Sequence, residues 1–372
     1  MWGLSIGGGR DQNERFNGLA QILKKENYDV VLLQEVMQLS NYESLLKETS
    51  QVLPYHASSL LDSKCSSSDI EERTQENCAG LLILSKHNLE NSKFTPYAGM
   101  GASNNIGNFE DFNGRGVLEA RMKMGSLTVD IFNTHLASLF AEDNGLDNSL
   151  LEVRGNQVST LLERIQASDA NIKIFGGDLN AYPIKDDANS PYARMTQDMI
   201  DSFVDRYPYQ VGNPDFATHG KAGNTYSGKK PDKTVDYLMH WADPSGWTMA
   251  TADFKIPEYK AINSDGKEVS ISDHEPLHAE YLIVPNDQDE SKFLSQVQMF
   301  RHKRHFFIPS TFQIQATASQ ILVKMVAFVS TTLMTTPANA DHSTMEEIVK
   351  LNKEVANHST KSIRHSLKYW GY

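Results

Sequence analysis

The apolar positions of this chain follow two periods, one typical of helices and one typical of strands. Residues 12–26 and 150–165 carry large apolar side chains at helical spacing with polar residues between them, which predicts two amphipathic helices. Apolar runs at 29–33 and 172–175 follow soon after these helices and predict buried strands. Helices therefore alternate with strands in the first half of the chain.

Further apolar runs continue this pattern. The runs at 116–122 and 127–132 predict an antiparallel pair joined by a turn at 124–126, and the run at 234–239 carries Asp236 in its middle. Alternation of strands with helices and hairpins predicts an α/β fold, a sandwich of mixed β-sheets. The runs lie at 80–84, 116–122, 127–132, 234–239 and 279–284.

The pattern changes after residue 284. Residues 285–291 are polar and predict a linker, and we expect no strands of the earlier type beyond it. We therefore predict a catalytic domain over residues 1–284 and a C-terminal tail over residues 285–372, partly helical or disordered.

Within this tail we expect a helix near 345–355. The apolar run at 321–334 is short and contains Lys324, so we interpret it as a packed or weakly interfacial helix that does not span a membrane. The first ten residues lack the pattern of a signal peptide. The only two cysteines are Cys65 and Cys78, and a disulfide and two free thiols remain equally open.

The charge is divided unevenly along the chain. The formal net charge is −12; residues 291–372 carry 10 Lys and Arg against 4 Asp and Glu, a net +6, so residues 1–290 carry −18. An acidic catalytic part repels phosphate backbones at long range, and nucleic-acid binding normally depends on Lys and Arg contacts. We therefore do not expect a nucleic-acid substrate.

Short polar motifs stand at the ends of the apolar runs. Acids, amides and imidazoles that strand ends bring to one rim are the residue types of a metal-assisted phosphate-ester site. The motifs are Gln34-Glu35, Asn133-Thr134-His135-Leu136, Gly176-Gly177-Asp178-Leu179-Asn180 and Ser272-Asp273-His274.

Three acidic or amide residues of these motifs are candidate ligands. Glu35 ends a buried strand, where a carboxylate suits a hard cation such as Mg²⁺; a solvated strand-end glutamate is the alternative. Asp178 and Asn180 stand two positions apart, so on an extended strand end both can face one pocket. There Asp178 could accept a proton from the attacking water or orient it, and Asn180 could donate to a phosphoryl oxygen. An ordinary Asp/Asn turn explains the same motif.

Candidate acid–base residues come from the other motifs. His274 is our general base, oriented by the adjacent Asp273, although an Asp-His pair is often only a surface turn. His135 could bind the phosphoryl group or protonate the leaving oxygen, but a strand-end histidine is commonly structural. Asp236 needs a partner inside its apolar strand, and Asn180 or His274 could supply it; capping of a neighbouring loop is the alternative.

The ordered series of motifs resembles the endonuclease/exonuclease/phosphatase superfamily, and within it the neutral sphingomyelinases. The resemblance spans about residues 2–284. The motifs that carry it are Leu33-Gln-Glu35, Asn113-Gly-Arg-Gly116, Thr134-His135-Leu136, Gly177-Asp-Leu-Asn180, Val235-Asp-Tyr237 and Ser272-Asp-His274, and for the narrower match Trp2-Gly3-Leu4, Arg154-Gly-Asn-Gln157, Gly223-Asn-Thr-Tyr-Ser227 and Asp273-His-Glu-Pro-Leu277.

The resemblance implies a four-layer sandwich of two sheets flanked by helices, as in DNase I. It implies Mg²⁺-dependent hydrolysis of sphingomyelin, or a related choline phospholipid at a membrane surface, to ceramide and phosphocholine. Glu35 would hold the metal, and His274 would activate water with Asp273 behind it. The residues that would position and stabilise the phosphorus are Asp178, Asn180, His135 and Asp236.

This chain departs from the family pattern at both ends. In the family, an asparagine two residues before the Trp-Gly helps to hold the metal, whereas here Met1 directly precedes Trp2, so we expect the first strand to be truncated. The tail at 285–372 does not match the hydrophobic C-terminal helices of animal members. We expect a membrane-associated, intracellular protein, with a secreted form left open because the N-terminus looks incomplete.

Two other functions remain open from the sequence. A nuclease of the same fold would use the same motifs, although the acidic catalytic part argues against it. A truncated homologue with an impaired metal site would instead act as a lipid-surface or protein-binding module.

Overall fold

The structure of the chain is a computed structural model. It describes residues 11–61, 79–97, 115–137, 148–180, 205–206, 217–227, 232–286 and 321–328. Contacts divide the chain into two units, Met1–Thr332 and Leu333–Tyr372, and all described residues belong to the first. The expectations for residues 1–10, for Cys65 and Cys78 and for the helix at 345–355 lie outside the described residues.

The first β-sheet brings together strands from both ends of the described chain. It consists of β1 (Val30–Leu33), β2 (Tyr55–Ser58), β3 (Leu82–Ser85), β10 (Trp247–Lys255), β13 (Leu277–Pro285) and β14 (Ile321–Phe328). The order across the sheet is β10-β13-β14-β1-β3-β2. Only β1 and β14 pair in parallel; the other neighbours are antiparallel, so the sheet is mixed.

The second β-sheet carries most of the polar strand ends. It consists of β4 (Leu89–Pro96), β5 (Gly116–Met124), β6 (Leu127–His135), β7 (Ile172–Asp178), β8 (Asp205–Arg206) and β9 (Asp236–Ala242). Its order is β4-β5-β6-β7-β9-β8, with β6 and β7 parallel. The helix α3 (Asn148–Gln166) forms the crossover that this parallel pair requires.

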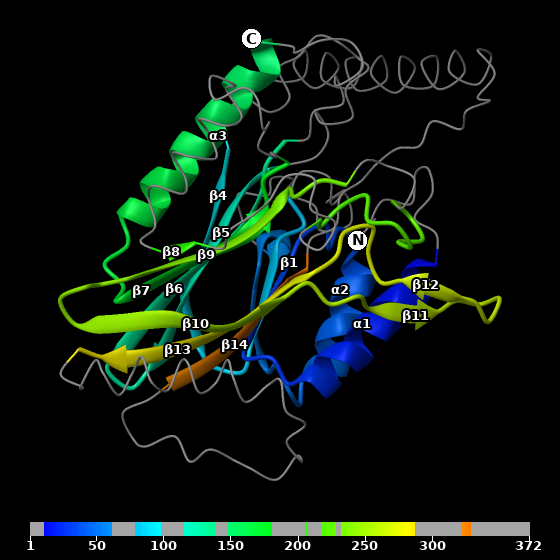
Figure 1. The fold of residues 1–372 in the computed structure, drawn as a ribbon, viewed down its shortest axis with the longest axis horizontal. Helices are drawn as coiled ribbons and strands as arrows, with labels where there is room; N and C mark the ends of the chain where they lie inside the picture. Colours follow the sequence, from blue (N-terminus) through cyan, green and yellow to red (C-terminus); the bar gives the residue numbers. More distant parts are fainter. Residues whose placement is uncertain are drawn as a thin grey trace, which may run out of the picture. The chain divides into compact units, whose positions relative to one another are not determined.

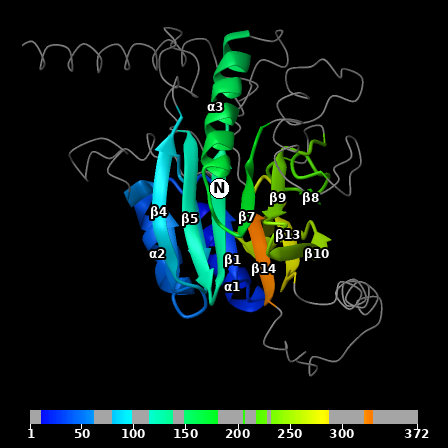
Figure 2. The same cartoon turned by 90° about the vertical axis from the view of Figure 1, so that its left-hand side faces the viewer.

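Helices cover the outer faces of the two sheets (Figures 1 and 2). Val158 and Leu161 of α3 share a cluster with Phe132 and Phe175 of the second sheet. On the other side, α1 (Gln12–Glu26) and α2 (Leu39–Thr49) pack their apolar residues into the core of the first sheet, beside a small hairpin of β11 (Lys260–Ile262) and β12 (Glu268–Ser270). The result confirms the predicted α/β sandwich of two mixed sheets flanked by helices.

Most predicted elements are confirmed within a few residues. The predicted helices at 12–26 and 150–165 are α1 and α3, and the predicted antiparallel pair is β5 and β6. One detail is wrong: Asp236 is the first residue of β9, not its middle. The apolar run of this strand continues to Ala242, beyond the segment that the sequence suggested.

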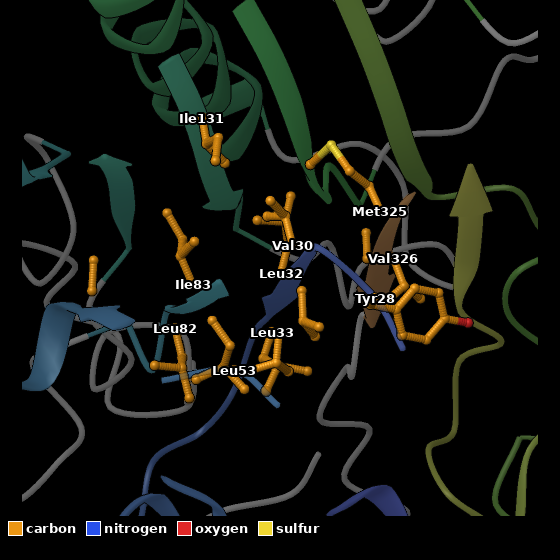
Figure 3. Packing of buried hydrophobic residues seen from close by; sticks show 14 of the residues in the cluster. Tyr28, Val30, Leu32, Leu33, Leu53, Leu82, Ile83, Ile131, Met325 and Val326 are labelled. Atoms are coloured by element: carbon orange, nitrogen blue, oxygen red, sulfur yellow. The ribbon is translucent and has the colours of Figure 1, made fainter. Parts of the chain in front are cut away.

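The segment after residue 284 differs from the prediction. The apolar run at 321–334, expected to be a helix, contains strand β14, which lies between β13 and β1 in the centre of the first sheet. Met325 and Val326 are fully buried and pack beside Val30 and Leu32 of β1 (Figure 3). A strand of the earlier type therefore lies beyond the boundary we expected at 284, because its nearly continuous apolar run is buried on both faces in the centre of the sheet. Among the described residues, no helix is long and apolar enough to cross a membrane.

Candidate active site

Three neighbouring strands of the second sheet bring three candidate residues side by side. In the parallel pairing of β6 with β7, His135 is opposite Asp178, and in the antiparallel pairing of β7 with β9, Asp178 is opposite Asp236. All three side chains are buried. Strand register therefore fixes one row of an imidazole and two carboxylates at this edge of the sheet.

His274 joins this row from the loop before β13. Its Nδ1 lies 2.8 Å from Asp236 Oδ2, and both side chains are buried. This hydrogen bond gives Asp236 one of the two partners that the sequence suggested. It also corrects one role: the carboxylate that orients the His274 ring is Asp236 on β9, not the adjacent Asp273. Neighbouring residues of an extended chain point to opposite sides, which favours a partner from another strand.

The segment 217–227 holds the loop that carries His274. Asn224 Nδ2 donates to the carbonyl oxygen of Ser272 and to Glu275 Oε1, each at 2.9 Å. Ser227 Oγ donates to the carbonyl oxygen of Asp273 at 2.5 Å. These buried bonds come from the Gly223–Ser227 motif, so this motif positions the His274 backbone.

His135 is held as a neutral ring. Arg115 Nη1 lies 2.6 Å from His135 Nδ1, and because a guanidinium can only donate, Nδ1 accepts and the ring proton sits on Nε2. Burial, followed by the charges of Arg115 and His274, lowers the pKa of His135 well below its ordinary value. The Nε2–H of His135 lies 3.4 Å from Asp178 Oδ2 and has no hydrogen-bond partner among the described residues.

Asp178 and Asn180 form a turn and part of the site at once. The backbone N–H of Asn180 donates to Asp178 Oδ1 at 2.6 Å, and Asn180 has a left-handed φ of 49°. The Asn180 amide donates to the carbonyl oxygen of Leu136 at 2.9 Å. The Asp/Asn turn is therefore real, and yet Asp178 Oδ2 remains without a hydrogen-bond partner among the described residues.

Gly177, the residue before Asp178, allows two strands of the sheet to approach each other closely. A Cβ at Gly177 would lie 2.1 Å from the carbonyl oxygen of Thr134 on β6. The close approach of the backbone at Gly177 is therefore to the neighbouring strand.

The buried charges shift each other's protonation. Burial, followed by the charge of Asp236, raises the pKa of Asp178 well above its ordinary value. Burial alone would lower the pKa of His274, but Asp236, Asp178 and Asp273 outweigh it and raise this pKa to about 9. The carboxylates around His274 therefore strongly favour a positive charge on its ring.

Glu35 follows strand β1 of the first sheet by two residues. It is buried and has a left-handed φ of 57°, a conformation that few residues other than glycine adopt. The preceding Gln34 donates its amide to Asn133 Oδ1 at 2.5 Å, and Asn133 donates to the carbonyl oxygens of Leu33 and Leu82. These bonds tie the end of β1 to β6, two residues before His135.

Two groups of described residues near His274 have the donor atoms for a metal ion. The ligand atoms of Asp178, Asp236 and His274 lie within 4.8 Å of one another, as do those of His219, Asp273 and His274. Glu35 belongs to neither group. Asp178 Oδ2 and Asp236 Oδ1 have no hydrogen-bond partner among the described residues, and paired buried carboxylate oxygens fit a hard divalent cation.

A family model described as the Endonuclease/Exonuclease/phosphatase family matches residues 4–274. The chain belongs to this family. The match covers every candidate site residue, from Glu35 to His274.

Curated relatives of the family are similar at modest identity. A Drosophila melanogaster protein that carries the name neutral sphingomyelinase is 25% identical over 289 residues, which cover 75% of this chain and 58% of that protein. An inositol phosphosphingolipids phospholipase C of Schizosaccharomyces pombe is 27% identical, over 57% of this chain and 46% of the relative. The chain thus spans about half the length of these relatives.

Solved structures support the fold. A beta toxin of Staphylococcus aureus matches with a TM-score of 0.52 at 18% identity, covering 72% of this chain and 92% of the toxin. A second structure of this toxin, with bound magnesium ions, matches with a TM-score of 0.51 at 17% identity, covering 73% of this chain and 92% of the toxin.

The structure adds residues around the site to which the sequence assigned no role. Arg115, which fixes the His135 tautomer, stands inside the 113–116 motif, so the motif was the available signal. Arg154 donates to the Leu179 carbonyl oxygen and Gln157 accepts from the Ala137 N–H, which anchors the ends of β7 and β6 to α3. His219, whose ring centroid lies 4.7 Å from that of His274, had no sequence signal because it lies in a polar, loop-rich stretch.

Proposed function

We propose that this protein is a Mg²⁺-dependent phosphodiesterase that hydrolyses sphingomyelin, or a closely related choline phospholipid, to ceramide and phosphocholine. The observation that carries the proposal is the buried row of His135, Asp178 and Asp236 with His274 bonded to Asp236. The names of the fly and fission-yeast relatives support a phosphosphingolipid substrate. We further propose that the enzyme acts at a membrane surface, where such a lipid is presented.

Proton transfer falls to the two histidines. The hydrogen bond at Nδ1 leaves His274 Nε2 to accept a proton from the attacking water, and Asp236 stabilises the imidazolium that forms. The water oxygen bonds to phosphorus, the bond from phosphorus to the ceramide oxygen breaks, and that oxygen takes up a proton. His135 keeps its proton on Nε2, where it can donate to a phosphoryl oxygen or to the departing one.

Positioning falls to the remaining polar groups. Asn180 has a second amide hydrogen beyond the one it gives to Leu136, and this hydrogen can bond to a phosphoryl oxygen. Glu35 and Asp178 would hold the metal. When bound, Mg²⁺ supplies a positive charge that polarises the phosphoryl oxygen and stabilises the charge developing in the transition state. Asp273 precedes His274, and its negative charge helps to raise the pKa of that ring.

The test is release of phosphocholine from sphingomyelin vesicles by the full chain, with Mg²⁺ and with a chelator. We expect release only with Mg²⁺, and a loss of about 10²-fold or more in rate for His274→Ala and for Asp178→Asn. His56→Gln is the matched control because His56 is an exposed histidine outside the site.

Calorimetric titration with Mg²⁺ adds a readout that does not depend on turnover. We expect saturable binding that Glu35→Gln weakens at least tenfold. Nicking of plasmid DNA that His274→Ala abolishes, without phosphocholine release, would assign the site to a nuclease and overturn the lipid substrate.

A further inference from the structure

A second cluster of metal-binding side chains lies on the first sheet, outside the site described above. It consists of Asp253 on β10 and of His278 and Glu280 on β13, whose ligand atoms lie within 4.8 Å of one another. His278 and Glu280 stand two positions apart on one strand, so they share a face of the sheet. We propose that this cluster binds a divalent transition-metal ion of the Zn²⁺ type, which ties β10 to β13.

The two carboxylates stand where they repel each other. Asp253 and Glu280 are direct partners in the antiparallel register of β10 and β13. Like charges in such a pair destabilise a sheet unless a positive charge lies between them. The register shifts between Thr251 and Asp253, and an irregularity of this kind re-aims side chains. It brings Asp253 onto the face of His278 and Glu280.

The imidazole of His278 points its unbonded nitrogen at these carboxylates. The side chain is fully buried, and its Nε2 has no hydrogen-bond partner among the described residues. This atom lies 3.5 Å from Glu280 Oε1 and 3.8 Å from Asp253 Oδ2. Both separations are wider than the distance of about 2.7–2.9 Å in a close charge-assisted hydrogen bond.

The same spacing suits a metal ion. In a tetrahedral site with ligand distances of about 2.0–2.1 Å, donor atoms lie roughly 3.3–3.4 Å apart. One nitrogen and two carboxylate oxygens are ligands that Zn²⁺ takes readily, with water completing the coordination. Asp253 is on an edge strand and its side chain is 23% exposed, which gives an ion a path from solvent.

A second layer of hydrogen bonds fixes the His278 ring. Nδ1 lies 3.2 Å from the Tyr28 hydroxyl, which lies 2.7 Å from the hydroxyl of Tyr259. The Tyr28 hydroxyl can accept from His278 Nδ1 and donate to Tyr259, and this arrangement puts the ring proton on Nδ1 and a lone pair on Nε2. Metal-binding histidines are commonly held in this way by a partner at the other nitrogen.

A nearby lysine is directed elsewhere. Lys324 on β14 is opposite Glu280 in the register, but its ammonium donates to the carbonyl oxygen of Glu26 and lies over the Tyr28 ring. The inference is independent of the proposed function, because none of the three ligands belongs to the candidate active site. A metal here would hold β13, the strand that follows His274, by its outer face.

The experiment is calorimetric titration of the metal-free full chain with Zn²⁺, together with thermal melting with and without Zn²⁺. We expect a saturable site that Asp253→Asn and Glu280→Gln each weaken at least tenfold and that Asp178→Asn leaves in place. Zn²⁺ should raise the melting temperature of the wild-type protein by more than that of Asp253→Asn.

Asp265→Asn is the matched control, an exposed aspartate in the β11–β12 turn, and it should bind Zn²⁺ like the wild type. Asp253→Asn changes a partly exposed side chain, and its melting without metal shows whether it is folded. Absence of Zn²⁺ binding to the wild type, or a number of bound Zn²⁺ ions that is unchanged in Asp253→Asn and Glu280→Gln, would overturn the proposal.

Discussion

At the scale of single residues, neighbouring charges decide the protonation of each histidine in the site. His274 and His135 are both buried histidines, yet the pKa of one is raised and that of the other is lowered. The difference lies in their partners: Asp236 bonds to His274, whereas Arg115 bonds to His135. The same residue type therefore has two different settings: Asp236 stabilises the protonated form of His274, and Arg115 fixes the neutral form of His135 with its N–H at Nε2.

The raised pKa of His274 predicts how stability depends on pH in the metal-free protein. The folded state holds this proton up to about pH 9, whereas the unfolded chain releases it near the ordinary value of 6.5. The stabilisation is therefore complete below pH 6.5 and is lost as pH rises through 9. We expect the free energy of unfolding to fall across this window by on the order of 3 kcal/mol more than in His274→Gln.

Guanidinium unfolding at a series of pH values with a chelator measures this difference. His135 does not interfere, because a lowered pKa affects stability only as pH falls below 6.5. His56→Gln should retain the wild-type pH dependence. Equal slopes for wild type and His274→Gln would contradict the assignment.

At the scale of elements, the site depends on loops that are tied to one another. The 217–227 segment bonds to the 272–275 loop through Asn224, whose Oδ1 also accepts from the N–H groups of Tyr226 and Ser227. Removal of one partner of such a buried hydrogen bond lowers the free energy of unfolding of the protein, because the other partners are left without a hydrogen bond.

Asn224→Ala should therefore disturb His274 without removing any group that touches the substrate. We expect a loss of about 1–3 kcal/mol in the free energy of unfolding, together with weaker Mg²⁺ binding. Asn263→Ala is the matched control, since Asn263 Oδ1 accepts two backbone N–H groups in the exposed β11–β12 turn. Denaturant unfolding and calorimetry compare the two; an equal effect on Mg²⁺ binding would refute the positioning role.

At the scale of the whole described unit, a strand from far along the chain fills the centre of the first sheet. β14 pairs with both β1 and β13, and Met325 of β14 is fully buried in the core (Figure 3). The sheet whose strand β1 precedes Glu35 and whose strand β13 follows His274 is therefore continuous only when residues 321–328 take this central position.

Substitution of Met325 tests this position of β14. Met325→Asp would bury an unpaired charge, and we expect it to lower the free energy of unfolding by more than about 3 kcal/mol. Met325→Leu conserves volume and should lower it by less than about 1.5 kcal/mol. Urea unfolding followed by circular dichroism measures both. If the aspartate variant were as stable as the leucine variant, residues 321–328 would lie outside the core.

Local patterns in the sequence determined which segments are helices or strands and which strand ends are polar. The period of apolar residues is a property of neighbouring positions, so α1, β1, β6 and β7 follow from it directly. The order of the motifs likewise indicated the family.

Only the tertiary structure decided how these pieces pair. The register of β6, β7 and β9 aligned His135, Asp178 and Asp236, and a bond between residues 38 positions apart gave His274 its carboxylate in place of the adjacent one. The apolar run at 321–334 by itself suggested a helix, and the neighbouring strands β1 and β13 make residues 321–328 a strand. Strand pairing depends on hydrogen bonds between distant segments and on the burial of the faces that they share. The local sequence of a single segment determines neither of these.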